Sequence, residues 1–288
     1  MEGHSPDVSV VLVHLNSRTE AERQLAELRA QQGVALELVA VDNASSDGTR
    51  DYLAAQPDVR LLGNAENVWL SRAWAQGVRA TSAPYVLLLT SDLSLPEAGA
   101  VAALKRALDE RPGAALAGPQ LVDEHGADAR NGAYAFPSVR WMAADLLGLA
   151  GVLRRKRRPA PVTAEGGDPR PVPFVNGACM LLRRTALEAI GGLDERYLLY
   201  WEEIDLAHRL GDAGFDVLVV PEVLGMHPGK GTPMLTGARR MAWRHGERLY
   251  FRAHHGVPAD LLIRALRVVE RGRRALARSG KPPAGPDA

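Results

Sequence analysis

The first half of the chain alternates short, almost continuously apolar runs with longer amphipathic segments. The first run, Val8–Val13, is rich in β-branched residues and predicts a strand that is buried on both faces. The full pattern predicts strands at 8–13, 36–41, 59–62, 85–89 and 114–118 and helices at 19–32, 49–55, 70–81 and 94–111. Strands that alternate with helices at this spacing indicate an α/β fold with a doubly wound, Rossmann-like sheet.

The pattern is less regular in the middle of the chain. A helix at 141–153 precedes five basic residues and a Pro/Gly-rich stretch, which we interpret as a mobile basic loop at about 154–172. Further elements are expected as strands at 178–182 and 217–220 and as helices at 185–190, from 202, at 235–254 and at 258–278. We therefore expect an α/β domain at 7–230 with halves at 7–120 and 121–230, a C-terminal helical extension at 231–280 and a disordered tail at 281–288.

The composition of the 288 residues is that of an ordinary globular protein, with 46% hydrophobic and 24% charged residues. The net charge of +1 hides an asymmetry, because residues 237–288 hold twelve Lys/Arg against four Asp/Glu. Cys179 is the single cysteine, which excludes a disulfide framework and fits a reducing compartment. Residues 1–7 lack the features of a signal peptide, and the longest apolar stretch, 143–153, is too short to span a membrane. We therefore expect a cytoplasmic protein.

Three carboxylates, Glu202, Glu203 and Asp205, directly follow an aromatic and aliphatic run at 197–201. Bulky apolar neighbours desolvate a carboxylate and raise its pKa, which suits it to proton transfer. If the segment is helical, Glu202 and Asp205 share a face and Glu203 points about 100° away. An ordinary amphipathic helix with an ion pair between Asp205 and Arg209 also fits, so the segment alone leaves both interpretations open.

Two further acids stand at the carboxyl ends of predicted strands, where open α/β sheets bind ligands. Asp42 and Asn43 follow the strand at 36–41, and Asp92 follows the strand at 85–89. Asp42 suits contact with a base or ribose, and Asp92 suits a divalent cation that bridges phosphates. Turn or cap residues would show the same pattern. The chain has no Walker-type loop and no G-x-G-x-x-G, so we do not expect those phosphate-binding devices.

A set of motifs lies in fixed order between residues 8 and 227. Its members are Val8–Val13 with Asn16, Asp42–Gly48, Glu66–Asn67, Asp92, Asn176–Ala178 with Arg183–Arg184, Gly191–Tyr197, Tyr200–Leu206 and Arg209. This set resembles glycosyltransferase family 2, in particular its bacterial rhamnosyltransferase-like branch. The resemblance implies a GT-A fold with a mixed sheet, a nucleotide-diphospho-sugar donor and inversion of the anomeric centre. Residues 7–120 would then be the nucleotide-binding half and residues 121–230 the acceptor half.

The resemblance also implies roles for single residues. Asp92 and His227 would hold Mg²⁺ or Mn²⁺ on the diphosphate, although a histidine after a strand can also be purely structural. Glu203 would be the catalytic base and Glu202 would position the acceptor. The residues expected to contact the donor are Asn16, Asp42, Asn43, Ser91, Asn176 and Gly177.

The sequence departs from the family pattern at several positions. Relatives usually carry Tyr where this chain has Leu15, Gly where it has Trp69 and Asp where it has Glu203. They often carry Asn in place of Ala75, and commonly Asn-Pro in place of Thr90-Ser91. Trp69 is the largest change, because it fills space near the nucleotide or sugar, where it either stacks on a ring or joins the core. These departures leave the donor sugar and its nucleotide base open.

The C-terminal segment combines arginines with apolar residues. They are Arg264, Arg267, Arg271, Arg273, Arg274 and Arg278 with Leu262, Leu266, Val269 and Leu276. A peripheral contact with the inner face of a membrane and a solvated face packed on the catalytic domain both fit. These helices are also the expected place for a homodimer contact. Nucleic-acid binding is not expected, because no stacking platform or recognition motif accompanies the charge.

The leading hypothesis is a metal-dependent, inverting glycosyltransferase that moves a sugar to a glycan or lipid-linked acceptor. A dTDP-rhamnose donor is favoured and a UDP-hexose comes next. Two alternatives stay open. A catalytically weak nucleotide-sugar-binding partner subunit would explain the departures at Trp69, Thr90 and Glu203. A nucleotidyltransferase could share the sheet and Asp92, but it gives no reason for the acids at 202–205.

Overall fold

The computed structural model describes residues 5–123, 125, 135–149, 167–227 and 236–279. The chain divides into two compact units, residues 1–136 with 161–246 and residues 137–160 with 247–288. The division after Gly246 differs from the predicted boundary at 230/231, because Trp243 packs on Tyr200 and Trp201 of the first unit. Most of the expected basic loop and the whole tail at 281–288 lie outside the described residues.

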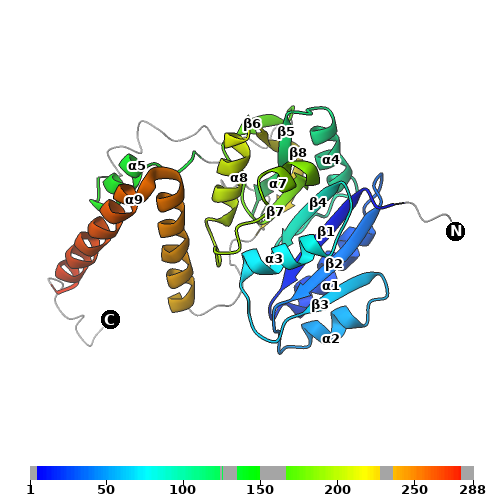
Figure 1. Cartoon of the computed structure of the whole chain (residues 1–288). Helices are drawn as coiled ribbons and strands as arrows, with labels where there is room; N and C mark the ends of the chain where they lie inside the picture. The colour runs from blue at the N-terminus through cyan, green and yellow to red at the C-terminus, as the bar shows by residue number, and fades with distance from the viewer. Residues whose placement is uncertain (1–4, 124, 126–134, 150–166, 228–235, 280–288) are drawn as a thin grey trace. The chain divides into compact units, whose positions relative to one another are not determined.

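The first unit is built around a mixed sheet of eight strands in the order β3-β2-β1-β4-β7-β5-β8-β6 (Figure 1). Its strands are β1 (Val8–His14), β2 (Leu36–Asp42), β3 (Val59–Gly63), β4 (Tyr85–Thr90), β5 (Ala114–Val122), β6 (Arg170–Val172), β7 (Cys179–Arg183) and β8 (Asp216–Met226). The strand β6 falls in the expected loop at 154–172 and pairs antiparallel with β8. The described sheet confirms the predicted α/β class.

Helices cover both faces of this sheet. The helices of the first unit are α1 (Arg18–Arg29), α2 (Thr49–Ala54), α3 (Leu70–Arg79), α4 (Ala100–Asp109), α7 (Arg184–Ala189) and α8 (Glu202–Asp212). Alternate residues of β1 point toward opposite faces of the sheet. Val10 and Leu12 join the core with α1 and α4, whereas Val11 faces α3. A Cβ at Gly77 of α3 would lie 2.2 Å from Val11 Cγ1, so glycine permits this close packing.

The helix after β4 begins later than the sequence predicts. We expected it from residue 94, but α4 starts at Ala100. Ser94 instead forms an isolated antiparallel bridge with Met226, and its hydroxyl donates to the Glu27 carboxylate at 2.6 Å. Both bonds tie the segment after β4 to the sheet and to α1, so the local helix signal is overridden.

The second unit contains α5 (Val139–Leu146) and most of α9 (Thr236–Ser279). Gly256 has non-helical angles (φ 82°, ψ 170°) inside α9, so the predicted pair of C-terminal helices is present as two arms with a break. Among the described residues, none of the helices combines the length and apolarity needed to cross a membrane.

The sheet topology brings segments from distant parts of the chain to one edge. The strands β1, β2 and β4 are parallel, so their carboxyl ends meet there. The strand β7 runs antiparallel to β4, so the residues before β7 reach the same edge. Since β5 is antiparallel to β7 and parallel to β8, His227 after β8 arrives there too. This edge is where open α/β sheets bind ligands.

Candidate active site

A cleft of about 220 Å³ opens at this edge of the sheet. Eight of the ten predicted site residues line it: Asn43, Ser91, Asp92, Asn176, Gly177, Glu202, Glu203 and His227. Asn16 and Asp42 are not among its lining residues. A larger and shallower hollow of about 750 Å³ lies along the loop at 191–196. It holds none of the predicted residues, and its Arg196 and Arg209 are already paired with Asp194 and Asp205, so we place the candidate site in the smaller cleft.

Asp92 and His227 form one side of the cleft. The Asp92 Oδ2 atom lies 3.3 Å from His227 Nε2, and the Thr90 hydroxyl donates to Asp92 Oδ1 at 2.7 Å. The backbone N–H of His227 donates to the Val122 carbonyl at 2.9 Å, which fixes the start of this loop. Burial by itself raises the pKa of Asp92, but the hydrogen bond and charge of His227 and the Thr90 bond hold that pKa below its usual value. Asp92 is therefore an anion at neutral pH.

The segment after β2 is organised by Asn43 rather than by Asp42. The Asn43 side-chain amide donates to Asn67 Oδ1 at 2.8 Å, and its oxygen accepts from the Val68 N–H at 2.9 Å. Asn43 thus holds the loop that precedes α3 against the cleft. Asn16 has a similar role in the neighbouring loop, since its side-chain oxygen accepts from the Ser46 N–H at 2.8 Å.

Asp42 is fully buried behind the cleft. Its Oδ2 atom accepts from the Ser45 N–H at 3.3 Å, while Oδ1 has no hydrogen-bond partner among the described residues. Its register partner in β1, His14, is also fully buried, and burial lowers the pKa of that imidazole to about 4. Direct contact between Asp42 and a nucleobase therefore requires a local rearrangement that exposes this carboxylate.

Trp69 lines the cleft from the position just before α3. Its backbone has φ 70° and ψ 173°, a region that is essentially restricted to glycine. The surrounding contacts hold this strained geometry: the Trp69 N–H donates to Asn67 Oδ1 at 2.9 Å, and the next residue, Leu70, donates to the Leu198 carbonyl at 2.9 Å. Strain that persists in a cleft is a sign of function. Trp74, inside α3, is fully buried.

The two glutamates at the start of α8 form the other side of the cleft. Tyr200 and Trp201, which precede them, both have positive φ (71° and 74°), so the chain turns sharply before the helix begins. Gly177 faces this turn, and a Cβ at that position would lie 3.3 Å from the Glu203 Cβ. Glycine at 177 therefore lets the segment before β7 approach Glu203 closely.

Glu202 and Glu203 form no ion pair with any of the described residues. The Oε2 atoms of both are buried and find no hydrogen-bond partner in the described part of the chain. Burial raises the pKa of Glu203 to about 7, and burial together with the charge of Glu203 raises the pKa of Glu202 well above its usual value. Both pKa values are thus raised toward or above neutral pH, which suits the pair to hold and exchange a proton.

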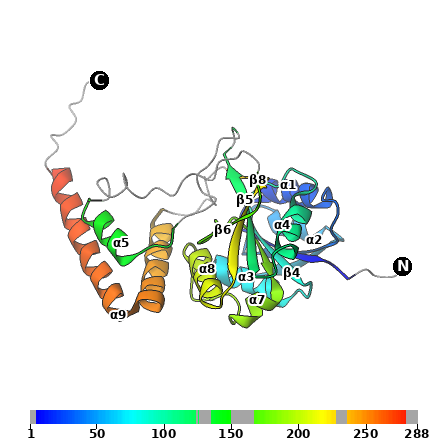
Figure 2. The same ribbon diagram turned by 90° about the horizontal axis from the view of Figure 1, so that it is seen from above.

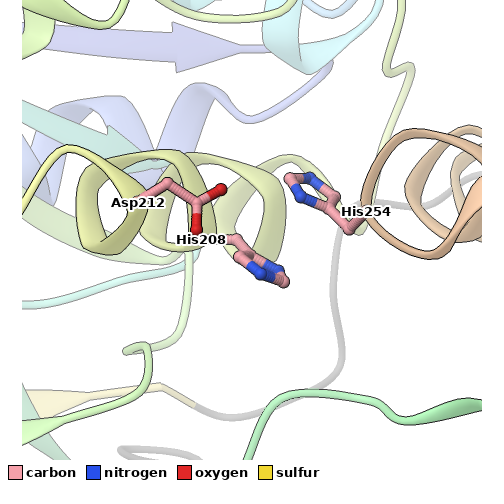
Figure 3. Close-up of side chains that lie close together, drawn as sticks. All are labelled: His208, Asp212 and His254. Carbon is pink, nitrogen blue, oxygen red and sulfur yellow. The ribbon is translucent and has the colours of Figure 1, made fainter.

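Asp205 supports the glutamates from within α8. Its carboxylate accepts from Arg209 Nε at 2.8 Å and from the Tyr197 hydroxyl at 3.2 Å, which confirms the predicted i,i+4 pair. Arg209 also donates to the carbonyls of Ile190 and Gly192, so the helix is tied to the loop before it. Figure 3 shows His208 and Asp212 farther along α8. His208 stacks on Phe136, Asp212 is exposed, and neither residue lines the cleft.

The model of a protein family described as Glycosyl transferase family 2 matches residues 9–191. The chain belongs to glycosyltransferase family 2. This family 2 glycosyltransferase is 31% identical over 237 residues to the N-acetylglucosaminyl-diphospho-decaprenol L-rhamnosyltransferase of Mycobacterium tuberculosis, a match that covers 76% of this chain and 75% of that protein. It is 23% identical over 207 residues to the low-salt glycan biosynthesis hexosyltransferase Agl10 of Haloferax volcanii, with 70% and 61% covered.

Solved structures agree with the GT-A fold of this glycosyltransferase. The mannosyltransferase PcManGT of Pyrobaculum calidifontis, in complex with GDP-Man and Mn²⁺, superposes with a TM-score of 0.58 at 17% identity. That match covers 97% of this chain and 77% of that one. GalNAc-T7 with UDP, GalNAc and Mn²⁺ gives a TM-score of 0.59 at 15% identity, covering 78% of this chain and 44% of that one. The predicted family and fold are therefore confirmed.

The glycosyltransferase cleft also contains a residue that the sequence analysis missed. Arg239, near the start of α9, lines the cleft together with Asp92 and Glu203. It lies outside every motif of the family, and its only signal in the sequence was the basic excess after residue 236.

Proposed function

We propose that this glycosyltransferase moves a sugar from a nucleotide-diphospho-sugar to a hydroxyl group of a lipid-linked glycan. A dTDP-rhamnose donor is favoured over a UDP-hexose. The observation that carries the proposal is the presence of two kinds of carboxylate in one cleft: Asp92 is paired with His227, whereas Glu202 and Glu203 have buried Oε2 atoms that find no partner among the described residues. The mycobacterial relative, whose name specifies L-rhamnose and a diphospho-decaprenol acceptor, supports the choice of donor and acceptor.

The side of the cleft with Asp92 suits the donor diphosphate. An anionic carboxylate and an imidazole nitrogen that lie 3.3 Å apart fit a Mg²⁺ or Mn²⁺ that takes few protein ligands and completes its shell with phosphate oxygens. When bound, the cation neutralises negative charge on the departing diphosphate. Arg239 adds a second positive group to the same cleft. The two solved glycosyltransferases, both with Mn²⁺, support this assignment.

The side of the cleft with the glutamates suits the acceptor. Glu203 accepts the proton of the acceptor hydroxyl while the oxygen of that hydroxyl forms a bond to the anomeric carbon of the sugar. The bond from that carbon to the diphosphate oxygen breaks, and its electron pair leaves with the nucleoside diphosphate, so the anomeric centre inverts. Glu202, which keeps its proton, positions the acceptor by donating a hydrogen bond.

A donor panel tests the proposal. The protein is incubated with Mn²⁺, a short-chain polyprenyl-diphospho-N-acetylglucosamine and, in turn, dTDP-rhamnose, UDP-glucose, UDP-N-acetylglucosamine and GDP-mannose. We expect nucleoside diphosphate release and a glycosylated lipid with dTDP-rhamnose. Release from another donor would overturn the choice of sugar. Binding of a nucleotide sugar without turnover of any donor would favour the partner-subunit alternative, and release of pyrophosphate would favour a nucleotidyltransferase.

A further inference from the structure

The arm of α9 after Gly256 carries an apolar face that the second unit leaves exposed. Five large apolar side chains on this arm are between 45% and 67% exposed: Val257, Leu261, Leu262, Val268 and Val269. At about 100° per residue, Val257, Leu261 and Val268 project within about 40° of one another. They form a stripe along the helix, and Leu262 and Val269 widen it on one side.

The opposite face of the same arm packs within the second unit. Ile263 is 2% exposed, and Asp260 is buried beside Arg248, whose Nε lies 3.8 Å away. Arg267 is ion-paired with Glu247 from the arm before Gly256 and with Glu270 from its own arm. Arg267 therefore belongs to the packed face rather than to the basic surface that the sequence predicted. These contacts fix the rotation of the helix, so the apolar stripe points away from the core of its unit.

Exposed arginines flank the stripe. Arg264 and Arg271 lie about 20° and 40° from Val257 around the helix, and both are exposed. Arg273 is exposed on the other flank and donates to the Leu146 carbonyl at the end of α5 at 3.5 Å. Next to that carbonyl, Leu147 and Leu149 are 39% and 53% exposed. Figure 2 shows α5 beside α9. The exposed part of this arm thus carries both apolar and positively charged side chains.

We infer that this surface docks on a membrane with anionic lipid headgroups. An amphipathic helix with aliphatic residues on one face and arginines at its borders lies in the interface, with its apolar side among the acyl chains and its guanidinium groups on the phosphates. A second copy of the chain fits less well, because two such faces would bring Arg264 and Arg271 of each copy near those of the other. The inference goes beyond the proposed function and does not depend on the donor or the acceptor.

The test is a vesicle flotation experiment with the full chain. The vesicles are pure phosphatidylcholine or equal parts of phosphatidylcholine and phosphatidylglycerol. We expect binding to the anionic vesicles and little binding to the neutral ones. The variant Leu261→Gln with Val268→Gln removes the centre of the stripe, and Arg264→Gln with Arg271→Gln removes its flanking charge. All four side chains are exposed, so the fold should persist. We expect each double variant to bind at least tenfold more weakly.

A matched variant controls for overall charge. Arg50→Gln with Arg106→Gln removes two exposed arginines of the first unit, and we expect it to bind anionic vesicles within about twofold of the unchanged protein. The inference is overturned if the unchanged protein does not bind anionic vesicles, or if the stripe variants bind them as strongly as the unchanged protein does. A dimer that dissociates on Leu261→Gln in analytical ultracentrifugation would assign the face to a second copy instead. Each of these results is independent of sugar transfer.

Discussion

The two sides of the cleft hold carboxylates of opposite character. Asp92 is paired with His227 and accepts a hydrogen bond from Thr90, so its pKa is held low and it stays charged. Glu202 and Glu203 have buried oxygens without partners, and burial raises the pKa of both. A fixed charge suits the binding of a cation and a diphosphate, whereas an ionisation near neutral pH suits proton transfer. The environment of each acid therefore separates binding from chemistry within one cleft.

The two sides are also built differently. Asp92 follows a regular strand, and the bridge between Ser94 and Met226 holds its loop on the sheet. Glu202 and Glu203 follow two aromatic residues with positive φ, Tyr200 and Trp201, and the Trp243 ring from α9 packs on both of them. Strain of this kind persists only where tertiary packing imposes it. Aromatic packing at this turn, together with the ion pair between Asp205 and Arg209 in α8, thus holds the two glutamates in place.

The largest effect should come from Glu203→Gln. The amide keeps the shape of the side chain but cannot accept the acceptor's proton, so we expect kcat to fall about 10²–10⁴-fold. Binding of the nucleoside diphosphate with Mn²⁺, measured by calorimetry, should stay within about twofold because Glu203 is not among the residues proposed to hold the metal or the diphosphate. A variant that keeps its kcat would show that Glu203 is not the base.

Asp92→Asn should give the complementary result. Loss of the charge that faces His227 should weaken Mn²⁺-dependent binding of the nucleoside diphosphate on the order of 100-fold. Binding measured in the presence of EDTA should change little, since the metal is then absent from both proteins. Equal weakening with and without the metal would contradict a role for Asp92 in metal binding.

A smaller effect concerns backbone strain at Trp69. Trp69→Gly and Trp69→Ala both remove the indole. The difference between their free energies of unfolding therefore reports the cost of the backbone angles at this position. We expect the Gly variant to be the more stable by about 1–2 kcal/mol in urea unfolding. Arg72, an exposed position inside α3, supplies the matched control, because there Gly should be less stable than Ala by about 1 kcal/mol. If the Gly variant were less stable than the Ala variant at both positions, the backbone at position 69 would not be strained.

Much of the fold could be predicted from the sequence, and so could part of the site. The apolar runs marked the strands, and the parallel arrangement then placed Asp92 and Asn43 at one edge. Asp42 shows the limit, because a strand-end position does not reveal that the following turn buries the carboxylate. Arg239 and the positive φ of Trp201 depend on tertiary packing around the start of α9. No local pattern encodes such contacts.

Glu203 is proposed to be the base and to titrate near neutral pH. The most direct test is the pH dependence of kcat/KM between pH 5 and 9, in the unchanged protein and in Glu202→Gln. Because burial raises the pKa of Glu203 to about 7, the base is protonated below that pH, and activity should rise as the pH passes through it and then level off. Glu202→Gln should keep this midpoint. A profile that is flat from pH 5.5 upward, or a midpoint that disappears in Glu202→Gln, would contradict the account.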